Sequence, residues 1–186
     1  ETIFEIHNLA KQLFPNGKEV SYDSNIKNML LSTKNYLENN IQYIYEATFN
    51  YQGVLITVDI LNYEPDGVSI YEVKSSTSIK DIHIHDVSIQ YYVLKSLGFN
   101  IKNVNIIHID NSYVREEELD IHKLFSIYNI TQEVILLQDN VLKNLETFMQ
   151  CIEKKDEPMI DIGTHCFSPY ECDAIDYCWN HIPKYS

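Results

Sequence analysis

Asp59, Glu72 and Lys74 have the residue types and the spacing that metal-assisted hydrolysis of a phosphodiester bond requires. Glu72 and Lys74 flank Val73 in a β-rich run, and strand alternation therefore places their side chains on one face of a sheet. Asp59 lies in the preceding β-rich run, where a hairpin brings it within reach of Glu72. Two carboxylates bind a hard cation such as Mg²⁺, which polarises the phosphate and activates a water, while a lysine offsets the developing negative charge.

A simpler interpretation is that these are solvent-facing charges on a half-exposed sheet, which is the commoner origin of a Glu-x-Lys pattern. The helix expected next bears on this choice. Its residues His83, Asp86 and Gln90 are spaced so that they share one helical face. That face either looks toward the carboxylates or is a polar surface stripe, and His85 beside it is interpreted as an exposed neighbour.

The apolar periodicity predicts the elements that position these side chains. Helical periodicity covers 3–13, 26–37, 83–97 and about 131–155, and β-rich runs cover 43–49, 54–61, 68–73 and 104–109. Turn-forming segments at 50–53 and 64–67 join the first three runs, so we expect an antiparallel meander. The third helix, beginning near His83, then leads to the fourth strand in a βαβ crossover, right-handed by default. Thr131 is the expected N-cap of the last helix.

Together these elements predict an α/β fold, in which a mixed central β-sheet is flanked by helices and combines the meander with the crossover. The main domain is expected to cover 1–155. The tail, 156–186, holds three of the five prolines and three of the four cysteines. We expect it to be an irregular Cys-rich appendage that is held by something other than a hydrophobic core.

The cysteines of the tail indicate a metal centre. Cys166, Cys172 and Cys178 are separated by five residues each, and nothing in the sequence indicates the secretion that would favour disulfides. Clustered thiols in a segment that lacks a core are typical of a bound metal or cluster. Zinc is the generic alternative, with His165 alongside.

A resemblance to a known group of enzymes rests on these same residues. The pattern of Asp59 followed by Glu72-Val73-Lys74, and then by a helix bearing Gln90, resembles the PD-(D/E)XK nuclease superfamily. Within it, the chain is similar to RecB-like exonucleases and to the CRISPR-associated nucleases that carry an iron–sulfur cluster. The string Glu-Val-Lys-Ser-Ser-Thr at 72–77 also resembles the N-terminal domain of uncharacterised bacterial proteins, in which a DnaQ-like 3′–5′ exonuclease domain follows. The resemblance implies a restriction-endonuclease-like fold.

The resemblance also implies roles for individual residues. Asp59 and Glu72 would be metal ligands, with the Val73 carbonyl as a third, and Lys74 would be the catalytic lysine. Some relatives take a further metal ligand from a histidine of the first helix, and His7 lies in the matching helix.

Two further positions match the family only in part. Glu46 matches an acidic position on the preceding strand, where it would assist a second metal or be a surface strand residue. Gln90 matches the motif that positions nucleic acid, together with His83 and Asp86. The tyrosine usually found four residues after the glutamine is leucine here, and Tyr91 or Tyr92 is the expected substitute.

For the tail, the resemblance implies a [4Fe–4S] cluster held by Cys166, Cys172 and Cys178. In the related nucleases a fourth ligand comes from upstream of the nuclease core, which here would precede Glu1. Cys151 is the one other cysteine of the chain. It lies outside the family pattern and is interpreted as a buried free thiol.

Composition limits how such a protein would hold its substrate. The 186 residues include 27 Asp and Glu against 14 Lys and Arg, a formal net charge of −13, which argues against nucleic-acid binding by bulk electrostatics. A narrow, metal-assisted site, or neighbouring segments, would have to hold DNA. No apolar run approaches the length of a membrane span and no signal peptide is visible, so we expect a cytoplasmic protein.

Together with the resemblance, which implies an exonuclease acting on DNA, these residues predict a Mg²⁺- or Mn²⁺-dependent deoxyribonuclease that acts exonucleolytically. RNA remains an open substrate, and further domains of a longer polypeptide are expected partners. Two other classes of function stay open. One is a catalytically inactive nuclease fold that serves as a scaffold for nucleic-acid binding or for docking a downstream exonuclease domain. The other is a zinc-stabilised interaction domain.

Overall fold

A computed structural model describes residues 3–182 of the chain. The chain separates into two compact units, Glu1–Lys143 and Asn144–Ser186. In chain order the elements are α1 (Ile3–Lys11), β1 (Lys18–Glu19), α2 (Ile26–Glu38), β2 (Tyr43–Tyr51), β3 (Val54–Glu64), β4 (Gly67–Lys74), α3 (Asp81–Ser96), β5 (Ile101–Ile109), α4 (Ile121–Leu124), β6 (Phe125–Asn129), α5 (Thr131–Leu136), α6 (Gln138–Glu153), the 3₁₀-helix η1 (Thr164–Cys166) and α7 (Ile175–Trp179).

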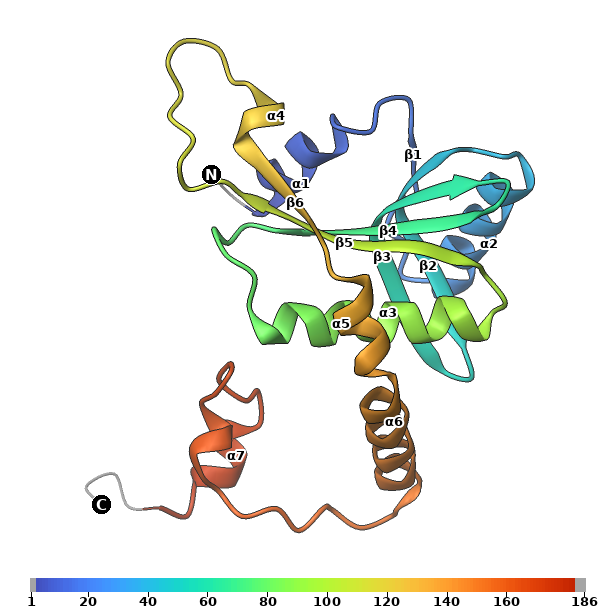
Figure 1. Ribbon diagram of the computed structural model, residues 1–186. Helices are drawn as coiled ribbons and strands as arrows, with labels where there is room; N and C mark the ends of the chain where they lie inside the picture. The colour runs from blue at the N-terminus through green and yellow to red at the C-terminus, as the bar shows by residue number, and fades with distance from the viewer. Residues whose placement is uncertain (1–2, 183–186) are drawn as a thin grey trace. The chain divides into compact units, whose positions relative to one another are not determined.

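The first unit is built on a six-stranded mixed sheet in which the strands lie side by side in chain order, β1 to β6 (Figure 1). Strands β2, β3 and β4 form an antiparallel meander. Helix α3 connects β4 to β5, which pairs parallel to β4. The pairs at the two ends are parallel between β1 and β2 and antiparallel between β5 and β6. The expectation of an α/β fold with a mixed sheet flanked by helices is confirmed.

The hairpin that joins β2 to β3 follows from its turn residues. Gln52 and Gly53 both adopt positive φ, 48° and 85°, as the tight turns that suit the twist of paired strands require. At the next turn, Gly67 has a φ of 152° and lies so close to the carbonyl oxygen of Asn100 that a Cβ atom would collide with it. Glycine is therefore needed at the start of β4.

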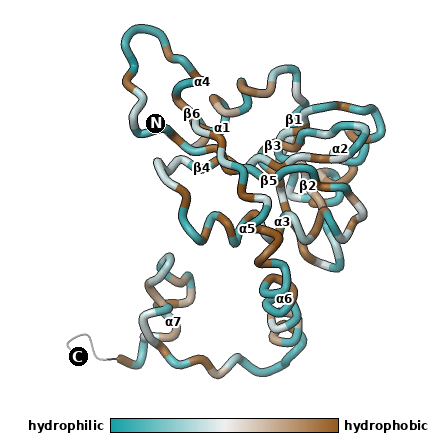
Figure 2. The backbone as a smooth tube through the Cα atoms, in the orientation of Figure 1, coloured by the Kyte–Doolittle hydropathy of each residue, from teal (hydrophilic) through white to brown (hydrophobic). Residues whose placement is uncertain are grey.

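Two apolar clusters cover the two faces of the sheet. The larger contains strand residues such as Ile44 and Val58, together with Val87 and Val93 of α3 and Val134 of α5. Side chains of α2 pack against it, and the second half of α5 is hydrophobic (Figure 2). The smaller cluster lies beneath α1. Its buried members are Ile6, Ala10, Phe14, Tyr45, Ile60, Val73, Ile107, Leu124 and Phe125.

Three features of the first unit differ from the sequence prediction. The short strands β1 and β6 were not expected, because neither has a recognisable alternation of its own. The predicted long helix from Thr131 to about Lys155 is wrong, because α5 ends at Leu136 and α6 begins at Gln138. The side chain of Gln138 donates to the carbonyl of Val134 at 2.9 Å, which caps the end of α5.

Thr131 is the first residue of α5 and not its N-cap, which is Ile130. Its hydroxyl instead accepts a hydrogen bond of 2.9 Å from the backbone N–H of Val104 in β5. Thr131 therefore ties the start of the helix to the sheet.

The second unit contains the end of α6 and the cysteine-bearing segment. The segment predicted to be irregular includes the short helices η1 and α7. Local backbone hydrogen bonds account for this difference, since Cys172 N–H donates to the Cys166 carbonyl at 2.8 Å and Cys178 N–H donates to the Ala174 carbonyl at 3.0 Å. These turns hold the segment that carries the three cysteines.

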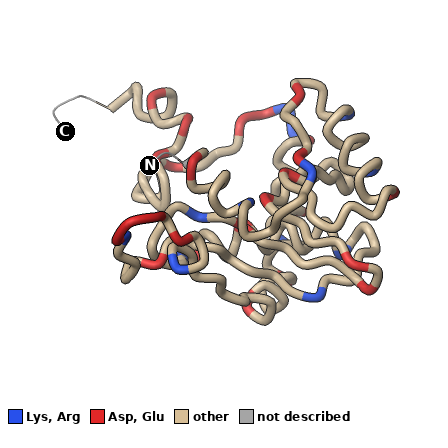
Figure 3. The backbone as a smooth tube through the Cα atoms, turned by 90° about the horizontal axis from the view of Figure 1, so that it is seen from above, with Lys and Arg blue, Asp and Glu red and all other residues tan. Residues whose placement is uncertain are grey.

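Charged residues are spread along both units, and the longest acidic run is Glu116–Glu118, between β5 and α4 (Figure 3). Within residues 3–182, no helix combines the length and the apolar character needed to cross a membrane.

Candidate metal centre

Strands β2 and β3 lose their regular alternation at one pair of opposed positions, Glu46 and Asp59. Backbone pairing joins Tyr45 to Ile60 and Ala47 to Val58, but skips the two acidic residues between them. Side chains of a regular strand share a face at every second residue. Here Ile44 and Ala47, three positions apart, pack in the same cluster. Each strand therefore turns an extra residue toward the face covered by α1.

The backbone of Glu46 explains this change of phase. Its φ is +56°, a left-handed conformation that side chains other than glycine rarely adopt. Such a residue costs about 1–3 kcal/mol and is held only where the surrounding structure enforces it. The consequence is that Tyr45 and Glu46 both face α1, Tyr45 in the apolar cluster and Glu46 beside the polar side chains of the helix.

Glu46, Asp59 and His7 converge on one point. Each offers a ligand atom, and the three atoms lie within 4.8 Å of one another. Among the described residues, no other group of three or more His, Cys, Asp or Glu side chains is arranged to hold a single metal ion. His7 comes from α1, which Ile6 and Ala10, both buried, anchor in the core.

The electrostatics of this group favour a cation. Burial, and then the nearby Glu72, raise the pKa of Asp59 well above its ordinary value, against the hydrogen bond from Val73. Burial lowers the pKa of His7, so its imidazole is neutral at neutral pH and can act as a ligand. His7 Nδ1 lies 3.8 Å from Asp59 Oδ1. A divalent cation would relieve the repulsion between the carboxylates.

Glu72 and Lys74 form a second group, on the side of β4 that faces α3. Lys74 Nζ lies 2.9 Å from Glu72 Oε1 and 3.2 Å from Asp86 Oδ2. Gln90 Nε2 donates to the other oxygen of Glu72, Oε2, at 2.8 Å. Burial opposes the charged form of Lys74, but the two carboxylates outweigh it and raise the pKa of Lys74 above its ordinary value. The expected side-by-side placement of Glu72 and Lys74 on one strand face is confirmed.

The two groups are joined through the backbone of β4. Asp59 Oδ2 accepts a hydrogen bond of 2.7 Å from the N–H of Val73, the residue between Glu72 and Lys74. Asp59 thus stands beside both groups, as the hairpin argument predicted. Of the metal ligands expected from the sequence, the structure brings His7 and Asp59 together with Glu46. Both oxygens of Glu72 are instead occupied by Lys74 and Gln90.

Lys11 is a residue of this site that sequence reasoning missed. Its amino group lies 3.4 Å from Glu46 Oε1 and 3.1 Å from Glu19 Oε1, and its side chain is 13% exposed. The ammonium also lies 5.7 Å from the centre of the Tyr45 ring. The signal was its spacing of four residues from His7, which places both on one face of α1.

The remaining residues expected to position nucleic acid have other contacts. His83 is buried, and its Nδ1 accepts a hydrogen bond of 3.2 Å from the Lys80 N–H, which caps the start of α3. Tyr91 packs against the larger apolar cluster. His85 is exposed, as interpreted from the sequence. Of the polar face predicted for this helix, Asp86 and Gln90 are the residues that reach the second group.

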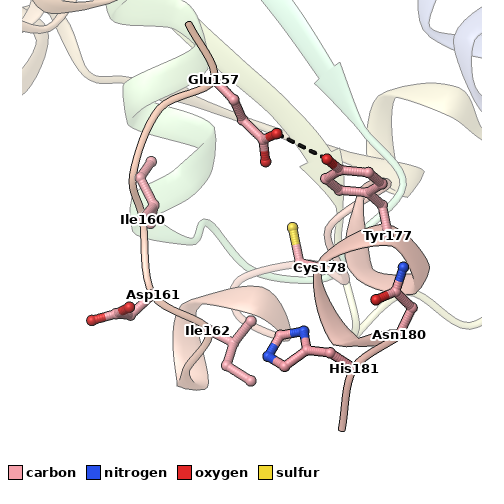
Figure 4. Close-up of a pocket in the computed structure, with 8 residues that line it drawn as sticks. All are labelled: Glu157, Ile160, Asp161, Ile162, Tyr177, Cys178, Asn180 and His181. Carbon is pink, nitrogen blue, oxygen red and sulfur yellow. Dashed lines mark hydrogen bonds between the residues drawn. The ribbon is translucent and has the colours of Figure 1, made fainter.

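The three cysteines of the tail line one cavity. This cavity lies within the second unit, has a volume of ≈ 430 Å³, and also receives His165. Cys151 is not among its lining residues. Cys178 borders a neighbouring hollow as well, into which its thiol points beside the hydrogen-bonded pair of Glu157 and Tyr177 (Figure 4).

One buried donor near the cysteines lacks a partner. Trp179 Nε1 makes no hydrogen bond of ordinary geometry in the described part of the chain. Its N–H nonetheless lies close enough to Cys166 to lower the pKa of that thiol, together with the backbone N–H of Gly163. Donors directed at a sulfur are typical of thiolate-bound metal centres, so the residues present fit a thiophilic metal or cluster.

Comparison with known proteins adds no assignment. The chain matches no family model. No curated protein matches it either.

Proposed function

We propose that this chain is a metal-dependent nuclease domain of the PD-(D/E)XK superfamily, of the RecB-like type with a restriction-endonuclease-like fold, which removes nucleotides from DNA ends with Mg²⁺ or Mn²⁺. The observation that carries the proposal is the convergence of His7, Glu46 and Asp59 within 4.8 Å, beside a strand that bears Glu72 and Lys74. Nitrogen and oxygen ligands of this kind suit Mg²⁺ and, with the imidazole, Mn²⁺.

Each side chain has a role in this proposal. His7, Glu46 and Asp59 bind the cation. When bound, a divalent cation polarises a phosphate oxygen and lowers the pKa of a water. Lys74 directs its ammonium at the attacking water and offsets the charge that develops on the phosphate. Gln90 holds the carboxylate of Glu72, which fixes Lys74 at 2.9 Å from it.

A second candidate function is a non-catalytic scaffold for nucleic acid or for a downstream exonuclease domain. Two observations favour it. Both oxygens of Glu72 are held by Lys74 and Gln90, so the metal ligand that the family pattern expects at this position does not join His7, Glu46 and Asp59. Tyr91 of α3 also packs against the apolar cluster, so it is not available to contact nucleic acid.

We also propose a metal centre in the tail, 156–186, with Cys166, Cys172 and Cys178 as ligands. Support comes from their shared cavity and from the buried N–H of Trp179, which lies close to Cys166. A [4Fe–4S] cluster is the centre that the family resemblance favours, with a fourth ligand from outside this trio, and Zn²⁺ is the alternative. Such a centre would supply the folding energy that a small core cannot. We also propose that the protein acts in the cytoplasm, where thiols stay reduced, and that this chain is part of a longer polypeptide.

Nuclease assays with Mn²⁺ on end-labelled single- and double-stranded DNA test the main proposal. Wild type should cleave, and Lys74→Ala should lose at least about 100-fold in rate, as for the removal of one electrostatic contact in an active site. Lys34→Ala is the matched control, because Lys34 forms an exposed pair with Glu38 on α2. Equal cleavage by wild type and Lys74→Ala would contradict the catalytic role, and DNA binding without cleavage would favour the scaffold.

A further inference from the structure

A groove adjoins the candidate metal centre on the α1 side of the sheet. Its volume is ≈ 630 Å³, and His7 and Glu46 belong to its lining. Helix α1 supplies one wall through Phe4, His7, Asn8 and Lys11, whose spacing puts them on a single helical face. A ligand bound at His7 and Glu46 would therefore extend into this groove.

The rest of the groove is largely apolar. Val20 and Tyr22 come from the segment after β1, and Met29 comes from α2. Two aromatic side chains of the lining are unusually open, Phe4 at 82% and Tyr22 at 86% exposed. Large apolar side chains that are exposed together at a concave site mark a place where a ligand binds.

The charges of the groove restrict what that ligand is. Lys11 is the one lysine or arginine among the described lining residues, and its amino group is already paired with Glu19 and Glu46 at 3.1 and 3.4 Å. A second phosphate would meet these carboxylates with no unpaired cation to offset them. A flat, uncharged group that stacks on aromatic rings suits the groove better.

We propose that the groove is a nucleobase-binding subsite, which receives the base next to the scissile phosphate of single-stranded DNA. Stacking on Phe4 and Tyr22 would hold the base, with the amide of Asn8 available to its edge. A paired base in a duplex is stacked on its neighbours and cannot offer its face to these side chains. The inference rests on the proposed function, because it assumes that the phosphate lies at His7 and Glu46.

Binding of a fluorescent single-stranded oligonucleotide in Mn²⁺ tests the subsite, measured by anisotropy in a Lys74→Ala background so that the DNA stays intact. Base–aromatic stacking contributes about 1–3 kcal/mol, so Tyr22→Ala or Phe4→Ala should raise the Kd about 5- to 150-fold. Tyr22→Trp should retain tight binding, because it keeps a stacking surface. Tyr128→Ala is the matched control, an exposed tyrosine on β6 at the opposite edge of the sheet, and should leave the Kd unchanged.

An abasic nucleotide, scanned along the same oligonucleotide, identifies the base that is held. At one position it should weaken binding to the Lys74→Ala protein, and at that position it should have little further effect once Tyr22 is alanine. Equal abasic penalties in both proteins at every position, or an unchanged Kd in the Phe4 and Tyr22 variants, would overturn the subsite. If the Tyr22 substitution removes the abasic penalty at one position while wild-type protein shows no Mn²⁺-dependent cleavage, the proposed hydrolysis fails and the subsite stands.

Discussion

Glu46 and Asp59 oppose each other at the position of the β2–β3 ladder where no backbone pair forms, and their carboxylates meet at the same point as His7. The broken pair and the shared site have one cause. A left-handed residue in β2 turns Glu46 to the α1 face, where Asp59 already lies. The fold therefore accepts local strain and carboxylate repulsion at one place, which is typical of a functional site.

Glu46→Gly and Glu46→Ala form a matched pair that separates backbone strain from ligand loss. Both remove the carboxylate, but only glycine adopts a φ of +56° without a Cβ penalty. We expect Glu46→Gly to be more stable than Glu46→Ala by about 1 kcal/mol, a difference of about 2–4 °C in Tm. Both variants should lose Mn²⁺ affinity. Equal stabilities by thermal unfolding would mean that Glu46 is not strained.

Asp59→Asn should stabilise the metal-free protein at neutral pH while it removes metal binding. The pKa of Asp59 is raised in the folded state, so its contribution to stability is full below the unfolded pKa and is lost as the pH rises through the folded value. Asparagine carries no charge to desolvate and still accepts the Val73 N–H. We expect a gain of about 1 kcal/mol at pH 7.

The pH series provides the check on this expectation. In metal-free buffer, the Tm of wild type should fall relative to that of Asp59→Asn as the pH rises from 4 to 7. This interval begins near the ordinary pKa of a carboxyl group and extends above it. A Tm difference between the two proteins that stays constant with pH would show that Asp59 does not titrate between pH 4 and pH 7. Asp23→Asn is a control, because the pKa of that exposed carboxyl is lowered and not raised.

The regular part of the site could be predicted from the sequence, and the irregular part could not. Glu72 and Lys74 lie in an uninterrupted strand, so the alternation rule puts them together. Glu46 enters the metal group only because β2 breaks that rule, at a glutamate whose left-handed backbone no propensity favours. Lys11 could not be assigned to the site from the sequence for a related reason, because its contact with the site depends on where Glu46 points.

Mn²⁺ should raise the Tm of wild type, and the increase should disappear in His7→Ala. A ligand that binds only the folded state at about 100 times its Kd adds about 2.7 kcal/mol of stability. The imidazole of His7 is half-buried and its lowered pKa keeps it neutral, so it loses its ligand capacity only at acidic pH. The Mn²⁺-induced shift should therefore be smaller at pH 5 than at pH 7.5. His85→Ala is the matched control, as an exposed histidine outside the group. A shift retained in His7→Ala would remove His7 from the metal site.

Gln90→Met should destabilise the fold and disturb Lys74 together. Gln90 is 7% exposed and gives Glu72, 8% exposed, one of its two side-chain hydrogen bonds. Loss of a hydrogen bond to a buried charge costs about 1.5–3 kcal/mol, which chemical denaturation would report. In nuclease assays, kcat should fall while the KM for DNA changes little, because Gln90 acts through Glu72 and Lys74 and not on the DNA. Gln132→Met on the exposed side of α5 should leave stability and kcat unchanged. If Gln90→Met raises KM and spares kcat, Gln90 contacts the nucleic acid, as the family motif would have it.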